Sequence, residues 1–162
     1  MAEDSVSPVD VEGPAELSLA EKIELACAME ATAPKPGNVH PRASFIDLRY
    51  ADFLAAAGAI AQPLSRAAEV GIGRSILDAI VATREKTGTN VNLGIVLLLG
   101  PLAAVPNQLP LESGVIEVLR GTSVEDAELV YAAIRQAKPG GMGESSSQDI
   151  SDRPTVTLRD AM

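Results

Sequence analysis

Apolar residues recur along this chain at the three- and four-residue spacing of amphipathic helices. In the first such stretch Leu19, Ile23 and Cys27 share one face, and Ser18 followed three residues later by Glu21 is typical of a capping box. No stretch shows the two-residue alternation expected of a strand. The pattern therefore predicts an all-α fold, a bundle of about six helices, over residues 19–32, 49–68, 72–86, 91–104, 112–120 and 123–137.

Proline, glycine and asparagine mark the predicted helix ends. Pro34 and Pro36 end the first helix because proline lacks an amide proton and restricts the residue before it. Pro63 kinks or interrupts the second helix. Gly88 suits the C-terminal cap of the third, and Asn90 can cap the fourth. Glycine-rich loops are thus expected at the helix ends.

The apolar residues are mostly small and aliphatic. The chain has two Phe, two Tyr and no Trp, which favours close-packed helices over a β-sandwich of strands rich in β-branched and aromatic residues. The predicted helix 91–104 is apolar nearly all round, so we expect it to be central and buried. Its most apolar stretch, 95–105, is far shorter than the roughly 20 residues that span a bilayer, so no membrane partner is expected.

The charge distribution argues against a nucleic-acid partner. The formal net charge is −9, and no cluster of Lys and Arg could follow a phosphate backbone. One cysteine, Cys27, cannot form an internal disulfide, which favours a cytoplasmic protein and a buried structural thiol. Residues 1–15 are acidic and contain proline, and we interpret them as a disordered tail that precedes a helical domain over 16–162.

The last residues predict a truncated domain. Thr157 with Asp160 begins another helix, yet the chain stops at Met162, and a one-turn helix is not stable alone. We therefore expect 16–162 to be the amino-terminal part of a larger domain. Loss of the remainder would expose the apolar face of the helix 91–104 and favour homo-oligomers.

Three loops combine glycine with polar or acidic residues, namely 30–47, 87–94 and 140–149. Glycine lets a ligand approach the backbone, free amides at a helix start favour phosphate, and carboxylates with phosphates hold Mg²⁺. Each loop alone has a simpler interpretation: a turn at Lys35 to Gly37, a helix cap at Asn90, a flexible glycine connection after Pro139. His40 is the only histidine, which excludes a multi-histidine metal site.

Taken together and in order, the three loops resemble the motifs of the triphosphoribosyl-dephospho-CoA synthase family. The resemblance is carried by Glu30 with PKPGNVHP, Ser44, Phe45 and Asp47, then by TNVNLGIVLLLGPLA, then by GGMG with Gln148 and Asp149, and finally by TLRDAM. It covers the chain from about Leu19 to its end. It implies an all-α transferase that uses ATP with Mg²⁺ and a CoA-like acceptor: adenine leaves ATP, and the triphosphoribosyl group moves to 3′-dephospho-CoA.

The resemblance also implies roles for individual residues. Because departure of adenine builds positive charge on the ribose, carboxylates near it would be catalytic. The catalytic residues implied are Glu30, Asp47 and Asp149, with Glu30 and Asp47 also as metal ligands. Those implied for binding the nucleotide are Lys35, Gly37, His40, Asn90, Asn92, Gly94, Gly140, Gly141 and Gly143.

One departure from the family pattern concerns the acceptor. Better-known members have a Thr-His-Lys-Gly run where this chain has Val91, Asn92, Leu93 and Gly94, so a cation is replaced by leucine. The Asn-Leu-Gly form is similar to a branch that accompanies pterin-linked one-carbon cofactor pathways, which leaves a related phosphoribosyl transfer open. The alternative is a catalytically inactive helical module for binding or assembly. A third class, an interaction fragment with no small-molecule site, requires the three loops to lie far apart.

Overall fold

The computed structural model describes residues 16–36, 39–46, 48–143 and 145–162. Within these ranges it contains helices only, apart from one isolated bridge between His40 and Ala43. The all-α prediction is therefore confirmed. The helices are α1 (Leu19–Thr32), α2 (Tyr50–Ser65), α3 (Ala67–Val70), α4 (Ile72–Thr87), α5 (Leu93–Ala103), α6 (Leu111–Arg120), α7 (Val124–Ala137) and α8 (Leu158–Ala161). Six of these have ten or more residues, as the pattern predicted.

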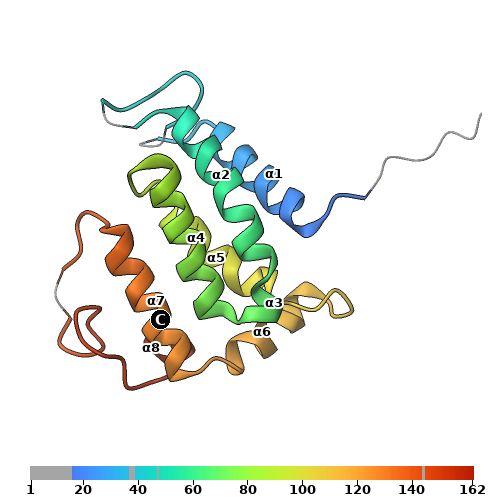
Figure 1. Ribbon diagram of the computed structural model, residues 1–162, viewed down its shortest axis with the longest axis vertical. Helices are drawn as coiled ribbons and strands as arrows, with labels where there is room; N and C mark the ends of the chain where they lie inside the picture. Colours follow the sequence, from blue (N-terminus) through green and yellow to red (C-terminus); the bar gives the residue numbers. More distant parts are fainter. Residues whose placement is uncertain (1–15, 37–38, 47, 144) are drawn as a thin grey trace, which may run out of the picture.

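Helices α1, α2, α4 and α7 lie side by side across the molecule (Figure 1), and each packs against the next. Helix α5 lies behind α4, while α3 and α6 close the lower end in this view. The end of α1, the start of α2 and the end of α4 lie at the upper left, and the end of α7 lies below them at the left edge (Figure 1). The first two glycine-containing loops thus leave the bundle from the same end, and the third begins below them.

The predicted helix boundaries are largely confirmed. The Ser18 hydroxyl accepts a hydrogen bond from the Glu21 amide at 3.3 Å, and the Glu21 carboxylate accepts from the Ser18 amide at 2.8 Å. Ser123 and Asp126 form the same reciprocal pair at the start of α7. Gly88 follows α4 with a φ of 73°, the left-handed conformation that favours glycine. Short-range sequence signals therefore placed these ends correctly.

One predicted interruption is confirmed, and one boundary differs from the prediction. The second helix is interrupted near Pro63, as predicted: α2 ends at Ser65 and α3 follows as a separate turn, so no single helix runs on to residue 68. Helix α5 begins at Leu93 rather than at Val91. The Asn90 side chain still caps it, since its Oδ1 accepts a hydrogen bond from the Leu93 amide at 3.1 Å.

The core consists of small aliphatic side chains, as the composition predicted. Small residues let the helix backbones approach closely. A Cβ atom at Gly73 in α4 would lie 2.7 Å from the Asp126 Cα atom of α7, and one at Gly100 in α5 would lie 2.7 Å from the Ile76 side chain of α4. These two glycines set how closely α4 packs against its neighbours.

The expectation that α5 is buried all round is wrong. Only Val96, Gly100 and Ala103 of this helix are buried, and Leu98 is 72 % exposed. The reason is that the contacts of α5 with α4 and with its other neighbours are slight compared with those between α1 and α2, α2 and α4, or α4 and α7. In the described part of the chain, no helix combines the length and apolar character needed to cross a membrane.

Candidate functional site

A pocket of about 380 Å³ lies where the first two loops meet the helix ends. We call it the polar pocket. It is lined by Glu30, Phe53, Asn90, Val91, Asn92, Leu93, Gly94, Ile95 and Pro139. These residues come from the end of α1, the start of α2, the first turn of α5 and the residue after the α7 cap. Segments that are far apart in the sequence therefore contribute to one polar cavity.

The start of α5 forms one wall of the polar pocket. The Leu93 amide donates its hydrogen bond to the Asn90 side chain, as described above. Gly94 is exposed, and a Cβ atom added to it would meet nothing within 4 Å, so its backbone is open to an approaching group. Positive electrostatic potential at a helix start favours anions. This wall is therefore suited to a phosphate or carboxylate.

Glu30, which lines the polar pocket, forms an ion pair with Lys35. Both side chains are 40 % exposed, so each remains accessible to a ligand. The pairing brings the predicted catalytic carboxylate and the predicted phosphate-binding cation together at the end of α1. It also neutralises the negative charge that Glu30 would otherwise present to an anion in the pocket.

The segment after α1 is held in place by a small apolar cluster. Val39 is 1 % exposed and packs with Ala31 of α1 and Phe53 of α2. His40 accepts a hydrogen bond from the Arg42 amide through Nδ1 at 3.3 Å and does not line the polar pocket. Gly37 and Asp47 lie outside the described residues, so their predicted roles stay predictions.

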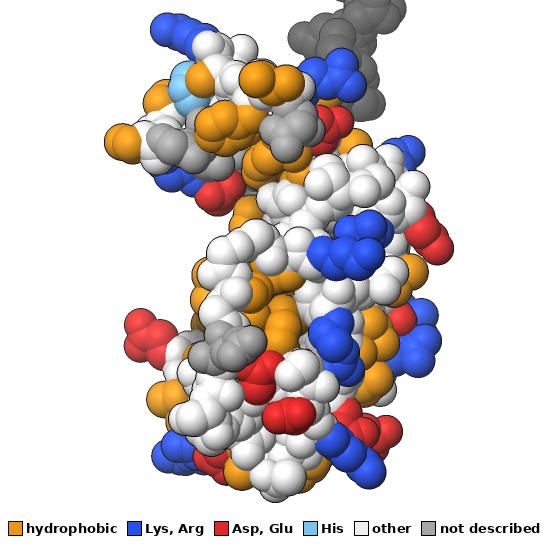
Figure 2. All heavy atoms as spheres, turned by 90° about the vertical axis from the view of Figure 1, so that its left-hand side faces the viewer, with side chains coloured by type: hydrophobic (Ala, Val, Ile, Leu, Met, Phe, Trp, Pro, Cys, Tyr) orange, Lys and Arg blue, Asp and Glu red, His pale blue; other side chains and the backbone are white. Residues whose placement is uncertain are grey.

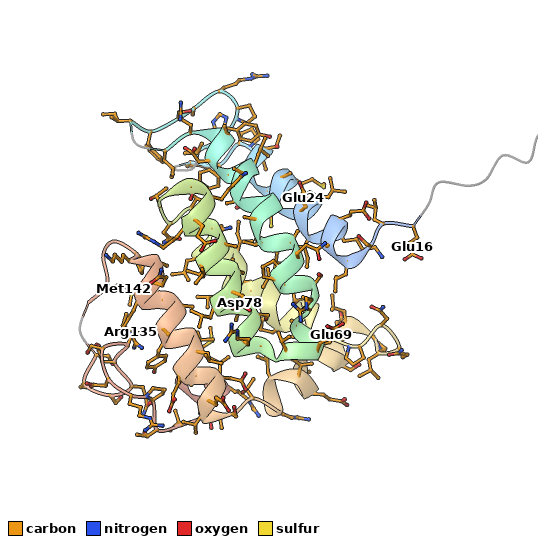
Figure 3. The ribbon with its side chains drawn as sticks, in the orientation of Figure 1. Glu16, Glu24, Glu69, Asp78, Arg135 and Met142 are labelled. Atoms are coloured by element: carbon orange, nitrogen blue, oxygen red, sulfur yellow. The ribbon has the colours of Figure 1, made fainter. Side chains whose placement is uncertain are left out.

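The third loop contributes less to the polar pocket than the sequence indicated. Pro139 lines it, whereas Gly140, Gly141 and Gly143 are exposed and are not among its lining residues. From there the loop runs down beside α7 (Figure 1). Figure 3 shows Arg135 reaching from α7 toward the loop that carries Met142, and the Arg135 guanidinium donates to the Ile150 carbonyl.

Asp149 lies in this descending segment, away from the residues that line the polar pocket. The Tyr131 hydroxyl of α7 donates to the Gln148 carbonyl at 2.7 Å and holds the segment against the helix. Hydrogen bonds from the Ser151 hydroxyl and from the Ser145 and Ser151 amides lower the pKa of Asp149 to about 2. Its carboxylate is thus occupied within its own loop, and its catalytic role stays a prediction.

An apolar cavity of about 200 Å³ adjoins the polar pocket and shares Glu30 and Ile95 with it. Cys27 lines this cavity and is buried. Burial, with a smaller contribution from the nearby Glu30 carboxylate, raises the pKa of the Cys27 thiol to about 11. The thiol is therefore protonated at neutral pH, in agreement with a structural role rather than a nucleophilic one.

A larger hollow of about 530 Å³ lies between α7 and residues 151–154. It contains none of the site residues predicted from the sequence, and its two arginines are already engaged. Arg153 donates to Glu128 at 2.6 Å, and Arg135 donates to the Ile150 carbonyl. Acidic and basic side chains are likewise interspersed on this side of the molecule (Figure 2). The polar pocket is the stronger candidate because residues of the first two predicted loops meet there.

Sequence reasoning missed several residues of the site, three of them outside the motifs that carry the family resemblance. Phe53 and Pro139 line the polar pocket, and Thr83 of α4 donates a hydrogen bond to Asn92 Oδ1 at 3.2 Å. Thr83 follows Ala79 and Ile80 at helical spacing, so a polar residue on an otherwise apolar face was the available signal. Among the residues that the structure describes, no three His, Cys, Asp or Glu side chains cluster in a way that could hold a metal ion.

Comparison of the chain with known proteins identifies its family. The family model described as CitG, ATP:dephospho-CoA triphosphoribosyl transferase, matches residues 16–162. Neither the curated proteins nor the solved structures contain a significant match to the chain. The family match includes all three loops and every described helix. The chain therefore belongs to the family of ATP:dephospho-CoA triphosphoribosyl transferases.

Proposed function

We propose that this chain catalyses nucleotide-dependent transfer of the triphosphoribosyl group of ATP to a hydroxyl group of 3′-dephospho-CoA, or of a related acceptor in one-carbon cofactor biosynthesis. The observation that carries the proposal is the polar pocket itself. In a chain of this family it unites Glu30, paired with Lys35, and the first turn of α5 around a cavity of about 380 Å³. A cavity of this size is within the range of small-molecule sites.

The proposed reaction exchanges one bond at the ribose C1′ atom of ATP. The bond from C1′ to adenine breaks, the acceptor hydroxyl oxygen bonds to C1′, and the hydroxyl proton ends on the departing adenine. Positive charge develops on the ribose as adenine leaves, so a nearby carboxylate stabilises the transition state. Glu30 is the described carboxylate that lines the polar pocket, and we assign this role to it. Asp47 remains a further candidate from the sequence.

Lys35 and the start of α5 would hold the triphosphate. A lysine ammonium group and free helix-start amides both favour phosphate oxygens. Mg²⁺ fits the same place because it commonly binds one or two protein carboxylates together with substrate phosphates, and Glu30 supplies a partly exposed carboxylate. When bound, the ion would neutralise phosphate charge, with Glu30 and Asp47 as its expected protein ligands.

The test incubates the chain with ATP, Mg²⁺ and 3′-dephospho-CoA, and measures the release of adenine by chromatography. We expect Glu30→Gln and Lys35→Ala each to lower the rate by about 100-fold or more, the effect of losing one group that stabilises transition-state charge. Glu112→Gln is the matched control, because Glu112 is an exposed residue of α6 outside the polar pocket. Near-normal rates in both site variants would refute the assignment.

The alternative is a helical binding or assembly module without catalysis. It is favoured by Leu93, which packs against the hydrophobic core where the family pattern has a lysine, and by the exposed apolar face of α5. Two measurements together distinguish the functions: thermal unfolding with ATP and Mg²⁺ reports binding, and the adenine assay reports catalysis. A ligand at 100 times its Kd adds about 2.7 kcal/mol to stability. Stabilisation without adenine release would support the module.

A further inference from the structure

The Asn92 side chain contains a buried hydrogen-bond donor without an acceptor. Asn92 is 6 % exposed and lines the polar pocket, and its Nδ2 atom has no partner among the described residues. Leaving such a donor unsatisfied costs free energy, so buried amides nearly always find an acceptor. An unsatisfied, almost wholly covered donor on a residue that lines a pocket points to an acceptor supplied by a ligand.

Thr83 determines which end of the Asn92 amide is left for that ligand. Thr83 is 1 % exposed in α4, and its hydroxyl donates to Asn92 Oδ1 at 3.2 Å. Because the oxygen end is thus occupied from α4, the nitrogen end remains as the donor. The contact crosses from one helix to the residue that precedes α5, so a rigid, buried residue controls the orientation of a pocket residue.

The surroundings of Asn92 favour an anionic acceptor. The amides of Gly94 and Ile95, in the first turn of α5, donate to no acceptor in the described ranges. They line the same pocket as Asn92, and the helix start adds positive potential. The carboxylate that lines the same pocket, Glu30, is paired with Lys35. Amide donors and a neutralised carboxylate together match a phosphate group.

We propose that Thr83 is a positioning residue, which orients Asn92 so that its amide nitrogen binds a phosphate oxygen at the start of α5. This inference deepens the proposed function, because it assigns the triphosphate of the donor nucleotide to this end of the pocket. It also gives a physical role to the neutral residues here. Amide donors bind the phosphate where Leu93 offers no charge.

The first test compares Thr83→Val with Thr83→Ser in the full chain. Valine keeps the shape of threonine but cannot donate to Asn92, whereas serine retains the hydroxyl. Inorganic pyrophosphate is titrated, and the amide NMR signals of Gly94 and Ile95 are followed. We expect Thr83→Val to weaken binding about tenfold, the loss of one oriented hydrogen bond to a charged group, and Thr83→Ser to stay close to the original chain. Equal affinities for all three chains would overturn the positioning role.

The second test replaces the donor directly. Asn92→Asp keeps the side-chain shape and the oxygen that accepts from Thr83, but substitutes a carboxylate for the amide. We expect pyrophosphate binding to be lost by about 100-fold or more, since a like charge then faces the anion. Asn107→Asp, in the exposed segment before α6, adds the same charge outside the pocket and should retain binding. If Thr83→Val does not fold, the comparison of Asn92→Asp with Asn107→Asp still tests whether Asn92 binds the phosphate.

The outcomes separate this inference from the proposed function. Pyrophosphate binding needs no group transfer, so expected results for the variants without any adenine release would refute the transferase and keep the phosphate site. If the chain releases adenine while its Gly94 and Ile95 signals do not respond to pyrophosphate, the phosphate site is refuted and the transferase is supported. Absence of pyrophosphate binding to the original chain at millimolar concentration overturns the phosphate site.

Discussion

Helices α4 and α5 are neighbours in the bundle but relate sequence to burial in opposite ways. Helix α4 carries five charged residues, yet seven of its residues are buried, whereas α5 has no charged residue and only three buried ones. Helix α4 packs between α2 and α7, while the contacts of α5 with its neighbours are slight by comparison. Burial therefore follows from how extensively neighbouring helices cover an element, and apolar composition alone does not produce it.

The two helices also contribute to the site in different ways. The first turn of α5 and the residues before it line the polar pocket, while α4 supplies Thr83 from beneath. A buried, well-packed helix is a rigid support, and a helix start offers free donors. The pocket thus depends on a helix whose own residues do not line it.

The largest effect should come from truncating equivalent apolar side chains in the two helices. Ile80 of α4 is 1 % exposed, and Leu98 of α5 is 72 % exposed. We expect Ile80→Ala to lower the free energy of unfolding by about 2–5 kcal/mol, and Leu98→Ala to change it by less than about 0.5 kcal/mol. Urea unfolding measures both. Similar losses for the two variants would mean that the α5 face is covered.

A smaller effect is expected from closing the space between helices. In Gly73→Ala the new methyl group would lie within 3 Å of the Asp126 backbone, which cannot move aside as a side chain can. We expect a loss of about 1–3 kcal/mol in stability. Gly58→Ala in α2 is the control, since its nearest neighbour is a Glu24 side-chain oxygen at 3.4 Å. Helix propensity should make that variant at least as stable as the original chain.

The cap of α5 should contribute about 1 kcal/mol. Asn90→Ala removes the side-chain acceptor for the Leu93 amide, and loss of such a cap typically costs about that amount. Asn107→Ala, an exposed substitution outside any helix, should change the unfolding free energy by less than about 0.5 kcal/mol. Thermal unfolding of both chains checks this prediction, and equal stability would show that Asn90 does not hold the start of α5.

The smallest effect should be pH-dependent and should leave the difference between α4 and α5 unchanged. The pKa of Asp149 is lowered from 3.8 to about 2, so its ionised form stabilises the fold above about pH 4, and this contribution disappears as the pH falls toward 2. Asp149→Asn should therefore lower the melting temperature at pH 5 and lower it much less at pH 2. Asp152→Asn serves as the control in the same loop. The gap between Ile80→Ala and Leu98→Ala should persist across this range, because it arises from packing.

Local sequence signals anticipated much of the fold and part of the candidate site. The capping pair of Ser18 and Glu21 and the turn at Gly88 depend on residues close in the chain, and both were predicted. The two-residue error at the start of α5 arose because Asn90 caps from three residues before Leu93, whereas the prediction took Asn90 to stand directly before the first helical residue. Glu30, Asn90, Asn92 and Gly94 were predicted for the site and do line one pocket.

Other features could not be predicted, because they depend on contacts between distant segments. The separation of Asp149 from the polar pocket follows from its loop being bound along α7 through Tyr131. The link from Thr83 to Asn92 joins two helices, and only its position on an apolar face hinted at a special role. Phe53 and Pro139 lack any polar signature and were found only through the cavity they line.

By itself the sequence determined the helices, their caps and the family, because hydrophobic spacing, capping residues and ordered motifs are local properties of the chain. The tertiary structure alone decided which apolar face stays exposed, which loops meet at the polar pocket and which atom of Asn92 remains without a partner. The physical reason is that burial and hydrogen-bond satisfaction depend on how separate helices pack against one another, and no single segment encodes that arrangement.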